Sequence, residues 1–596
     1  MATKLPSPNL PRIPVEVDGL QINFCKNPAC KNFGVAALQN SPRVGGIRGP
    51  RHEYVKNTSL QNQLLDCLGC GERLPIKSNL AIREEVRRHI ADGQVAPTPG
   101  CPNDQCSNHD IPLQIGKCKQ HYQSFGTSHA GSSRYRCKNC GRTFTVARRS
   151  TIRQRESHKN RTLFSLLVNK MPMRRICEAA EVNPRTLYRR IDFFYNQCKA
   201  YCAHREAVLF DGSLKIKRLY LAVDRQEYML NWSTQQDKRN VVVRAVASAD
   251  DRTGYIFGMH ADFDPAMDPE TIEADAAALG DVALPHAYRK YARVWLNADY
   301  TDAVRSRYGK NAKAARAAKS LLNDIQKSYD EAALRPDIES ASVHSFDSKL
   351  PAHGMQVHPE YTLYGHFFYL KQLLVGVEKI RFFLDQESGI RAACLAAFQE
   401  DVVMRRVDAF FVRINKDLTV NERRQSIADS RAEFEKARAL HPGLKPSEVE
   451  LLLIQERIKS MQAIGKWKDK WLAHPFPSMS EPEKQICYLT DMGDYKVDHL
   501  ARLYSRASLH AIDRYFMQIR RRINLLERPI STSSAAGRVW YGYSPYNAEV
   551  VIKLLTIFRV FYNYVAAGED GKTPAMRLGL AKAKIDIEDL LYFVAP

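Results

Sequence analysis

The sequence predicts a multidomain chain in which small cysteine-rich modules and a helical module precede a larger α/β domain. Three observations lead to this prediction. One cysteine pattern occurs twice in the first 150 residues, two amphipathic segments follow it, and from residue 215 the hydrophobic period changes to that of strands. The length of 596 residues fits several domains, and a hydrophobic content of 44% suffices for real cores.

The composition indicates a polyanionic partner. There are 88 Lys and Arg against 65 Asp and Glu, a formal net charge of +23, which favours nucleic acid first and an anionic membrane surface second. No run of eighteen apolar residues occurs, and the N-terminal "MATKLPSPNLPRIPVEV" lacks the apolar core of a secretory signal. We therefore expect a cytoplasmic, nucleoid-associated protein whose 14 cysteines are thiols or metal ligands and not disulfides.

The cysteine repeat predicts two structural zinc sites. The pattern CxxxxC…CxxC appears twice, and each copy offers the four thiolates of a tetrahedral Zn²⁺ site. We place the two zinc ribbons at residues 20–80 and 95–150. The predicted ligands are Cys25, Cys30, Cys67 and Cys70 in the first ribbon, and Cys101, Cys106, Cys137 and Cys140 in the second.

The stretch "TLFSLLVNKMPMRRICEAAEVNPRTLYRRIDFF" predicts a helix-turn-helix domain at residues 160–200. Asn183 is a plausible N-cap and Pro184 fits the first position of the following helix. An ordinary pair of packed helices fits the pattern equally well, but the neighbouring basic and cysteine-rich segments favour DNA. The side chains expected to contact DNA are Arg185, Thr186, Tyr188, Arg189 and Arg190.

The central part of the chain predicts a ribonuclease-H-like α/β domain. "KIKRLYLAVDRQEYMLNW" and "RNVVVRAVASADDRTGYIFGMHADFD" read as three consecutive antiparallel strands, and "KIRFFLDQESG" and "VDAFFVRI" as two strands around a helix. The domain covers 210–420 with a helical insertion at about 266–360. A second helical insertion covers 421–510, because that length is too great for a simple connection, and 511–596 forms the C-terminal part.

Three acidic residues at the ends or centres of these elements predict a catalytic metal site. They are Asp224 on the first strand, Asp385 at the end of the fourth, and Glu527 on a late helix rich in arginine. Converging carboxylates favour Mg²⁺ or Mn²⁺, and a pair of such ions activates phosphodiester displacement. Two alternatives stay open: Asp299 in place of Asp385, and Glu549 in place of Glu527, although Glu549 stands in the first turn after a predicted Asn547 cap.

At these residues the chain resembles a bacterial insertion-sequence transposase of the DDE type. The resemblance rests on "LAVD", "FFLDQESG", "INLLERPISTSS" and the tail "YNYVAAGEDGKTPAMRLGLA", and on zinc ribbons placed before a helix-turn-helix. It implies nicking and strand transfer of element DNA, with Asp224, Asp385 and Glu527 as the acidic ligands. Many members carry a basic residue seven positions after the Glu. Here that position is Ser534, and the nearest downstream base, expected to contact DNA, is Arg538.

Two other functions remain possible on the sequence alone. One is a non-catalytic zinc and helix-turn-helix regulator, which has no need of three converging acids. The other is a ribonuclease-H-like nuclease that cuts without joining. For a transposase we expect double-stranded DNA, both element ends and target, as the partner, a homo-oligomer on DNA because two ends are handled together, and no membrane.

Overall fold

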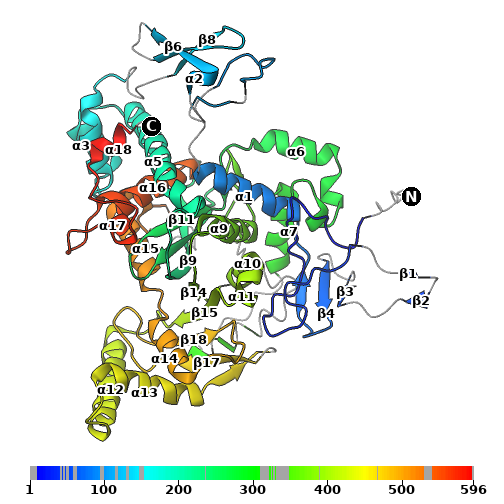
Figure 1. Cartoon of the computed structure of the whole chain (residues 1–596), viewed down its shortest axis with the longest axis vertical. Coiled ribbons are helices and arrows are strands. Elements are labelled where there is room, and N and C mark those ends of the chain that lie inside the picture. The colour runs from blue at the N-terminus through cyan, green and yellow to red at the C-terminus, as the bar shows by residue number, and fades with distance from the viewer. Residues whose placement is uncertain are drawn as a thin grey trace.

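The computed structural model describes most of the chain and shows a multidomain α/β architecture (Figure 1). The described residues are 10–39, 43–44, 47–48, 53–57, 63–93, 100–109, 111–113, 118–128, 133–146, 154–234, 236–308, 321–323, 325–326, 329, 348–387, 389–465, 468–528 and 540–593. The predicted order, with cysteine-rich modules first, then helices and then a mixed sheet, is confirmed at this level.

An eight-stranded mixed sheet forms the centre of the molecule. Its spatial order is β11-β10-β9-β14-β15-β18-β17-β16. The first three strands form an antiparallel meander, β14 runs parallel to β9, and β15 runs parallel to β14. The strands are β9 (Leu219–Leu230), β10 (Val241–Asp250), β11 (Ile256–Ala261), β14 (Ile380–Asp385), β15 (Val407–Ile414), β16 (Gln462–Ile464), β17 (Asp469–Ala473) and β18 (Lys484–Tyr488).

Helices cover both faces of this sheet, which explains its almost continuous apolar strands. On one face, Ser248 of β10 lies 2.7 Å from His366 of α9 (Pro359–Leu373), measured from Oγ to Nε2. On the other face, Tyr515 of α15 (His510–Arg522) donates to Met259 of β11. Met259 pairs with Ala247, and Ala247 pairs with Asp224, so α15 covers the face that carries Asp224.

The segment predicted as a helical insertion at 421–510 also contributes strands. It contains α12 (Val420–Leu440), α13 (Pro446–Lys459) and α14 (Val497–Arg506), as expected. It also contains β16, β17 and β18, which extend the main sheet beyond β15. These strands were missed because they are short and the charged helices around them dominate the pattern. All residues of β18 are buried, and β18 pairs with β15, so this segment is part of the main sheet.

The earlier insertion, predicted at about 266–360, contains the expected helices and ends in a short strand. It contains α6 (Pro269–Ala278), two short 3₁₀ turns (Asp281–Ala283 and His286–Tyr288) and α7 (Asn297–Tyr308). The strands β12 (Phe263–Asp264) and β13 (Met355–Gln356) pair with each other at its base. After β14 the chain forms α10 (Ile390–Ala397) and α11 (Gln399–Val403), the helices that lead into β15.

The first cysteine module is fused to this body. Its strands are β1 (Arg43–Val44), β2 (Ile47–Arg48), β3 (Tyr54–Asn57), β4 (Leu64–Cys67) and β5 (Arg73–Pro75). The chain then runs directly into α1 (Asn79–Gly93), which lies against α9 (Figure 1). Lys77 pairs with Glu360 at 3.5 Å, and the backbone N–H of Ser78 donates to the hydroxyl of Tyr361. Apolar residues of the module, among them Ile22 and Phe24, belong to the main core.

The second cysteine module has a small core of its own and stands at one end of the molecule (Figure 1). It consists of α2 (Cys118–His121), β6 (Tyr122–Thr127), β7 (Ser133–Cys137) and β8 (Thr143–Val146). The three strands form a separate antiparallel sheet. Its core comprises Cys101, Cys106, Leu113, Tyr122 and Cys137, with Ile111, Tyr135, Cys140, Phe144 and Val146 packed against it.

The helical module is anchored to the body by one long helix. It contains a 3₁₀ turn (Ser157–Lys159), α3 (Asn160–Leu167), α4 (Met173–Ala179) and α5 (Pro184–Phe210). The predicted cap is confirmed, because the Asn183 side chain accepts from the backbone N–H of Thr186 and Pro184 starts α5. Near the other end of α5, buried Glu206 pairs with Arg559 and accepts from Tyr255. This buried network fixes the module to the sheet.

The C-terminal part closes the body with short helices. After α15 come a 3₁₀ turn (Asn524–Leu526), α16 (Ala548–Val560), which continues as a π-helical turn (Phe561–Val565), α17 (Pro574–Leu578) and α18 (Ile587–Leu591). The helix α16 packs against α5 and β11. Among the described helices, none combines the length and apolar composition that a membrane span requires.

Candidate active site and zinc centres

Three carboxylates converge at the centre of the sheet. Asp224, Asp385 and Glu387 each offer an oxygen, and these oxygens all lie within 4.8 Å of one another. Asp224 lies within β9 and Asp385 is the last residue of β14. The parallel pairing sets Leu384 opposite Val223, so the following residues on the two strands, Asp385 and Asp224, lie side by side. Two of the three predicted acids therefore meet as expected.

The cluster is partly buried, and its carboxylates repel one another. Asp224 is only 6% exposed. Burial raises the pKa of Asp224 well above its usual range, and the carboxylates of Asp385 and Glu387 raise it further. Burial and the charge of Glu387 raise the pKa of Asp385 to about 6. Hard oxygen ligands in this arrangement suit Mg²⁺ or Mn²⁺, whose charge would neutralise the repulsion.

Glu387 was not selected from the sequence. It stands two residues after Asp385, and its backbone N–H donates to the Asp385 carbonyl, a tight turn that brings both carboxylates to the same place. The Glu387 side chain also pairs with Arg225, whose guanidinium is 7% exposed. The sequence signal was present in "FFLDQESG", because a second acid directly after a strand end stands near the first.

A fourth acid, Asp513, faces the same cluster from α15. Its carboxylate lies 3.4 Å from Lys416, and its charge contributes to raising the pKa of both Asp224 and Asp385. Burial lowers the pKa of Lys416, but Asp513, Asp224 and Asp385 outweigh this effect and raise it. The sequence did not predict Asp513, because its place beside the cluster depends on the packing of α15 against β9.

The structure gives Glu527 other partners. The helix α15 ends at Arg522, so Glu527 follows the helix and a 3₁₀ turn and does not lie on the helix as predicted. Its Oε1 is 2.7 Å from Lys170, and Tyr541 donates to its Oε2 at 3.1 Å. Among the described residues, the acidic group that meets the 4.8 Å condition holds Asp224, Asp385 and Glu387 but not Glu527. The chain leaves the helix at Ile523, where the backbone becomes extended, and Glu527 then lies beside Gln226 and Tyr228 of β9.

The two alternative acids have structural partners elsewhere. Asp299 lies in the first turn of α7 and pairs with Arg289 at 2.6 Å. Glu549 lies in the first turn of α16 after the Asn547 cap, which is confirmed, and pairs with Lys553. Both acids form local ion pairs, and both lie in the first turn of a helix, where a negative charge is favourable. Arg538 and Ser534 lie outside the described residues.

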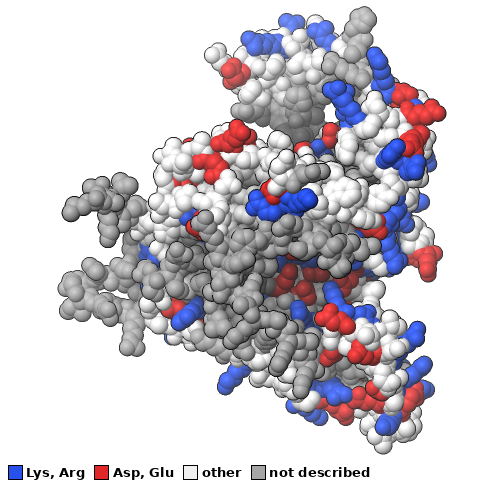
Figure 2. All heavy atoms as spheres, turned by 180° about the vertical axis from the view of Figure 1, so that it is seen from behind, with Lys and Arg blue, Asp and Glu red and all other residues white. Residues whose placement is uncertain are grey.

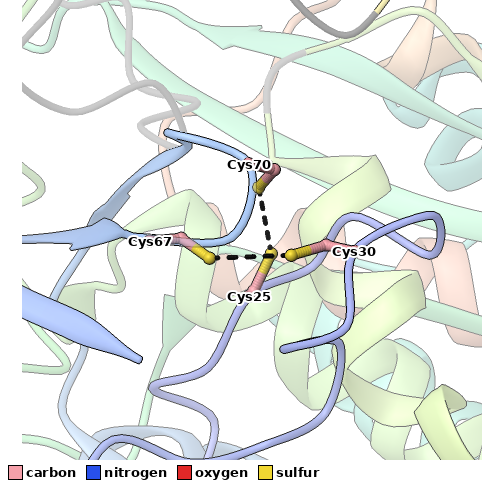
Figure 3. Close-up of side chains that lie close together, drawn as sticks. All are labelled: Cys25, Cys30, Cys67 and Cys70. Atoms are coloured by element: carbon pink, nitrogen blue, oxygen red, sulfur yellow. Dashed lines mark hydrogen bonds between the residues drawn. The ribbon is translucent and has the colours of Figure 1, made fainter. Parts of the chain in front are cut away.

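Each cysteine repeat brings its four sulfurs together as predicted. Figure 3 shows the first group. The Sγ atoms of Cys25 and Cys70 are 3.5 Å apart, and those of Cys30 and Cys67 are 3.7 Å apart. In the second group, Cys101 and Cys140 are 3.3 Å apart and Cys106 and Cys137 are 3.8 Å apart. Zn–S bonds of about 2.3 Å in a tetrahedron separate sulfurs by about 3.8 Å, so both groups fit Zn²⁺.

The duplication extends beyond the cysteines. In the first module the amide of Asn32 donates to the sulfur of Cys67, and in the second the amide of Asn108 donates to that of Cys137. Tyr54 and Tyr122 likewise accept from the backbone N–H of Cys25 and Cys101. Burial raises the pKa of Cys137, but hydrogen bonds from Cys140, Asn108 and Asn139 outweigh it and lower this pKa to about 6. Such support favours the thiolate that binds metal.

The predicted DNA-contacting face of α5 is only partly exposed. Arg185, Tyr188 and Arg189 are exposed, whereas Thr186 is half-buried because its backbone is tied to the Asn183 cap. Arg190 is 7% exposed and donates to the carbonyl of Arg155, which corrects its predicted exposure. Its position, three residues after the buried Leu187, places it on the core side of the helix.

Comparison of the sequence with models of known protein families found no match, and comparison with curated proteins found none either.

Proposed function

We propose that this chain is a DDE-type transposase that cuts and joins DNA with Mg²⁺ or Mn²⁺. The observation that carries the proposal is the convergence of Asp224, Asp385 and Glu387 from two parallel strands and the turn that follows. A meander of three antiparallel strands, with a fourth strand parallel to the first and a fifth parallel to the fourth, is the topology expected of a ribonuclease-H-like domain. The transposase resemblance in the sequence adds the substrate class.

The acidic residues have distinct roles in this proposal. Asp224, Asp385 and Glu387 supply oxygen ligands, and Asp513 supplies a carboxylate from α15, the helix that contacts β9. A divalent pair bound there would activate the attacking oxygen and stabilise the leaving oxygen of a phosphodiester. Asp224 is 6% exposed, so the sheet and the helix packed on it screen this carboxylate from bulk water.

Basic groups around the cluster would hold the DNA backbone. Lys416 lies beside Asp513. Arg520 lies on the last turn of α15, where burial and the charge of nearby Arg528 lower the pKa of its guanidinium. In this proposal the helical module presents Arg185, Tyr188 and Arg189 to the element ends. The helix α5 holds the bound DNA in a fixed position relative to the sheet, because Glu206 near its far end is buried against Tyr255 and Arg559.

The test uses the purified protein with the DNA that flanks its gene. In Mg²⁺ or Mn²⁺ we expect nicking at the element ends and joining of the new 3′ ends to a target plasmid. Asp224→Asn should abolish both while leaving binding to the same DNA unchanged, because it removes a metal ligand and no exposed DNA contact. Strand transfer that persists in Asp224→Asn would refute the site, and cutting without joining would identify a nuclease.

A further inference from the structure

The two cysteine modules share one scaffold but meet different surroundings. When the matching cysteines are aligned, strand β4 of the first module corresponds to β7 of the second. In β4, Leu64 and Leu65 are 2% and 0% exposed. In β7 the corresponding residues are Arg134 and Tyr135, which are half-buried. The first module is therefore closed against other parts of the chain, while the second leaves the same strand accessible.

Three positions on and after this strand are neutral or acidic in the first module and basic in the second. Asp66 of the first module corresponds to Arg136, Leu68 to Lys138, and Glu72 to Arg142. Arg136, Lys138 and Arg142 are all exposed. Figure 2 shows Lys and Arg side chains at the outer end of the module at the top of the view, where Figure 1 places β6 and β8. Three neutral or acidic positions have thus become basic on one copy only.

An exposed aromatic ring lies among these arginines. Phe125 of β6 is 45% exposed, and the guanidinium carbons of Arg134 and Arg136 lie 5.6 Å and 6.0 Å from the centre of its ring. Arg134 and Arg136 alternate with Tyr135, so they point to the outer face of the small sheet while Tyr135 packs toward Phe144. An apolar ring flanked by cations suits a base stacked on the ring and phosphates held beside it.

We infer that the two modules have divided their roles: the first is a structural part of the catalytic body, and the second binds an unpaired DNA strand. Its binding surface is Phe125 with Arg134, Arg136, Lys138 and Arg142. In a duplex both faces of each base are covered by neighbouring bases, and opening that stack costs a few kcal/mol. A single ring on a flat sheet therefore fits an unpaired base best. The inference rests on the proposed DNA partner but not on the proposed chemistry.

The test measures binding of the full-length protein to a labelled single strand and to its duplex over a range of salt, without added Mg²⁺. Arg134→Gln/Arg136→Gln should reduce the slope of log affinity against log salt on the single strand by about 1.4, the value for two lost phosphate contacts. Phe125→Ala should weaken single-strand binding about tenfold and duplex binding much less. Zinc content and the melting temperature should be unchanged in both variants.

The matched control neutralises two exposed cations of the first module, Lys31→Gln/Arg73→Gln, and should leave the salt slope unchanged. An unchanged slope in the Arg134/Arg136 variant, or an equal loss in the control, would overturn the division of roles. Equal loss of duplex and single-strand binding in Phe125→Ala would overturn the unpaired strand as the partner. Wild-type protein that binds no DNA would overturn the proposed function as well, whereas lost cleavage with intact binding would leave this inference standing.

Discussion

Lys170 and Glu527 form an ion pair, with Nζ 2.7 Å from Oε1, that joins the helical module to the chain after α15. The backbone of Lys170 strengthens the connection, because its N–H donates to the carbonyl of Arg522 at the end of α15. Its ammonium also donates to the carbonyl of Arg520 at 3.1 Å. Lys170 thus caps the helix that carries Asp513, and Glu527 holds Lys170 in place.

This relationship predicts opposite results for two acidic variants. Glu527→Gln should keep DNA cleavage within about twofold of wild type and cost less than about 1 kcal/mol of stability, because the pair is about one-third exposed. Asp513→Asn should lower cleavage by a factor of about 10 to 100, as expected for a residue beside the metal ligands. Cleavage rates in Mg²⁺ measure both. A larger loss in Glu527→Gln would restore Glu527 to the metal site.

Removing a carboxylate from the cluster should stabilise the metal-free protein. Asp224 is buried beside Asp385 and Glu387, so Asp224→Asn relieves repulsion and should raise the free energy of unfolding by about 1–2 kcal/mol in the absence of divalent ions. The wild type should gain stability on addition of Mn²⁺, and the variant should gain little. Thermal unfolding with and without Mn²⁺ measures this difference. Asp299→Asn changes an acid that pairs with Arg289 and is not in the cluster, so it serves as the control and should keep the Mn²⁺ response.

Loss of zinc should affect the two modules differently. Cys101→Ser removes a ligand from the second module, which has its own small core, so zinc content should fall from two ions to one while the main unfolding transition stays in place. Cys25→Ser should also lower the main transition, because residues of the first module such as Phe24 belong to the main core. Metal analysis and calorimetry report both effects. Equal shifts in the two variants would contradict the structural role of the first module.

A buried histidine cluster predicts loss of stability in mild acid. His89 and His366 are buried and His260 is half-buried, and the Nδ1 atoms of His260 and His366 are 2.9 Å apart. Burial lowers the pKa of His366 to about 3, and burial and neighbouring cations lower the pKa values of His89 and His260. Each folded pKa lies below the unfolded value near 6.5. The neutral histidines therefore make their full contribution to the free energy of unfolding above about pH 6.5, and this contribution is lost as the pH falls below that value.

The variant His366→Asn isolates this contribution. It removes one titrating ring, so between about pH 6 and 4 its free energy of unfolding should fall less steeply than that of wild type, by about 1.4 kcal/mol per pH unit. Urea denaturation across this range provides the comparison, and the buried carboxylates cancel because both proteins contain them. Identical slopes would show that His366 does not titrate on unfolding.

One double and one single arginine variant on α5 separate DNA contact from packing. Arg185→Gln/Arg189→Gln should weaken DNA binding and reduce its salt dependence with little change in stability, because both side chains are exposed. Arg190→Gln should instead lower the free energy of unfolding by about 1–3 kcal/mol, because it removes a buried donor to Arg155. Filter binding and urea denaturation measure the two effects. Weaker DNA binding only in Arg190→Gln would reverse the assignment.

The sequence alone determined the features that depend on local spacing. The zinc groups follow from cysteines placed close along the chain, and the Asn183 and Asn547 caps follow from side chains that bond their own backbone two or three residues on. The strands around Asp224 and Asp385 were also predictable, since their apolar runs end in an acid. Parallel pairing of those strands then brought the two carboxylates together.

Only the tertiary structure decided which acids from distant segments join them. Asp513 faces Asp224 because the packing of α15 on the sheet places it there, while one extended residue after α15 directs Glu527 to Lys170. The same applies to the two cysteine modules, whose ligand spacing is alike but whose surroundings differ. Spacing along the chain fixes local geometry, whereas the side of the sheet or core that a residue finally faces depends on contacts between distant segments, and no local pattern encodes those.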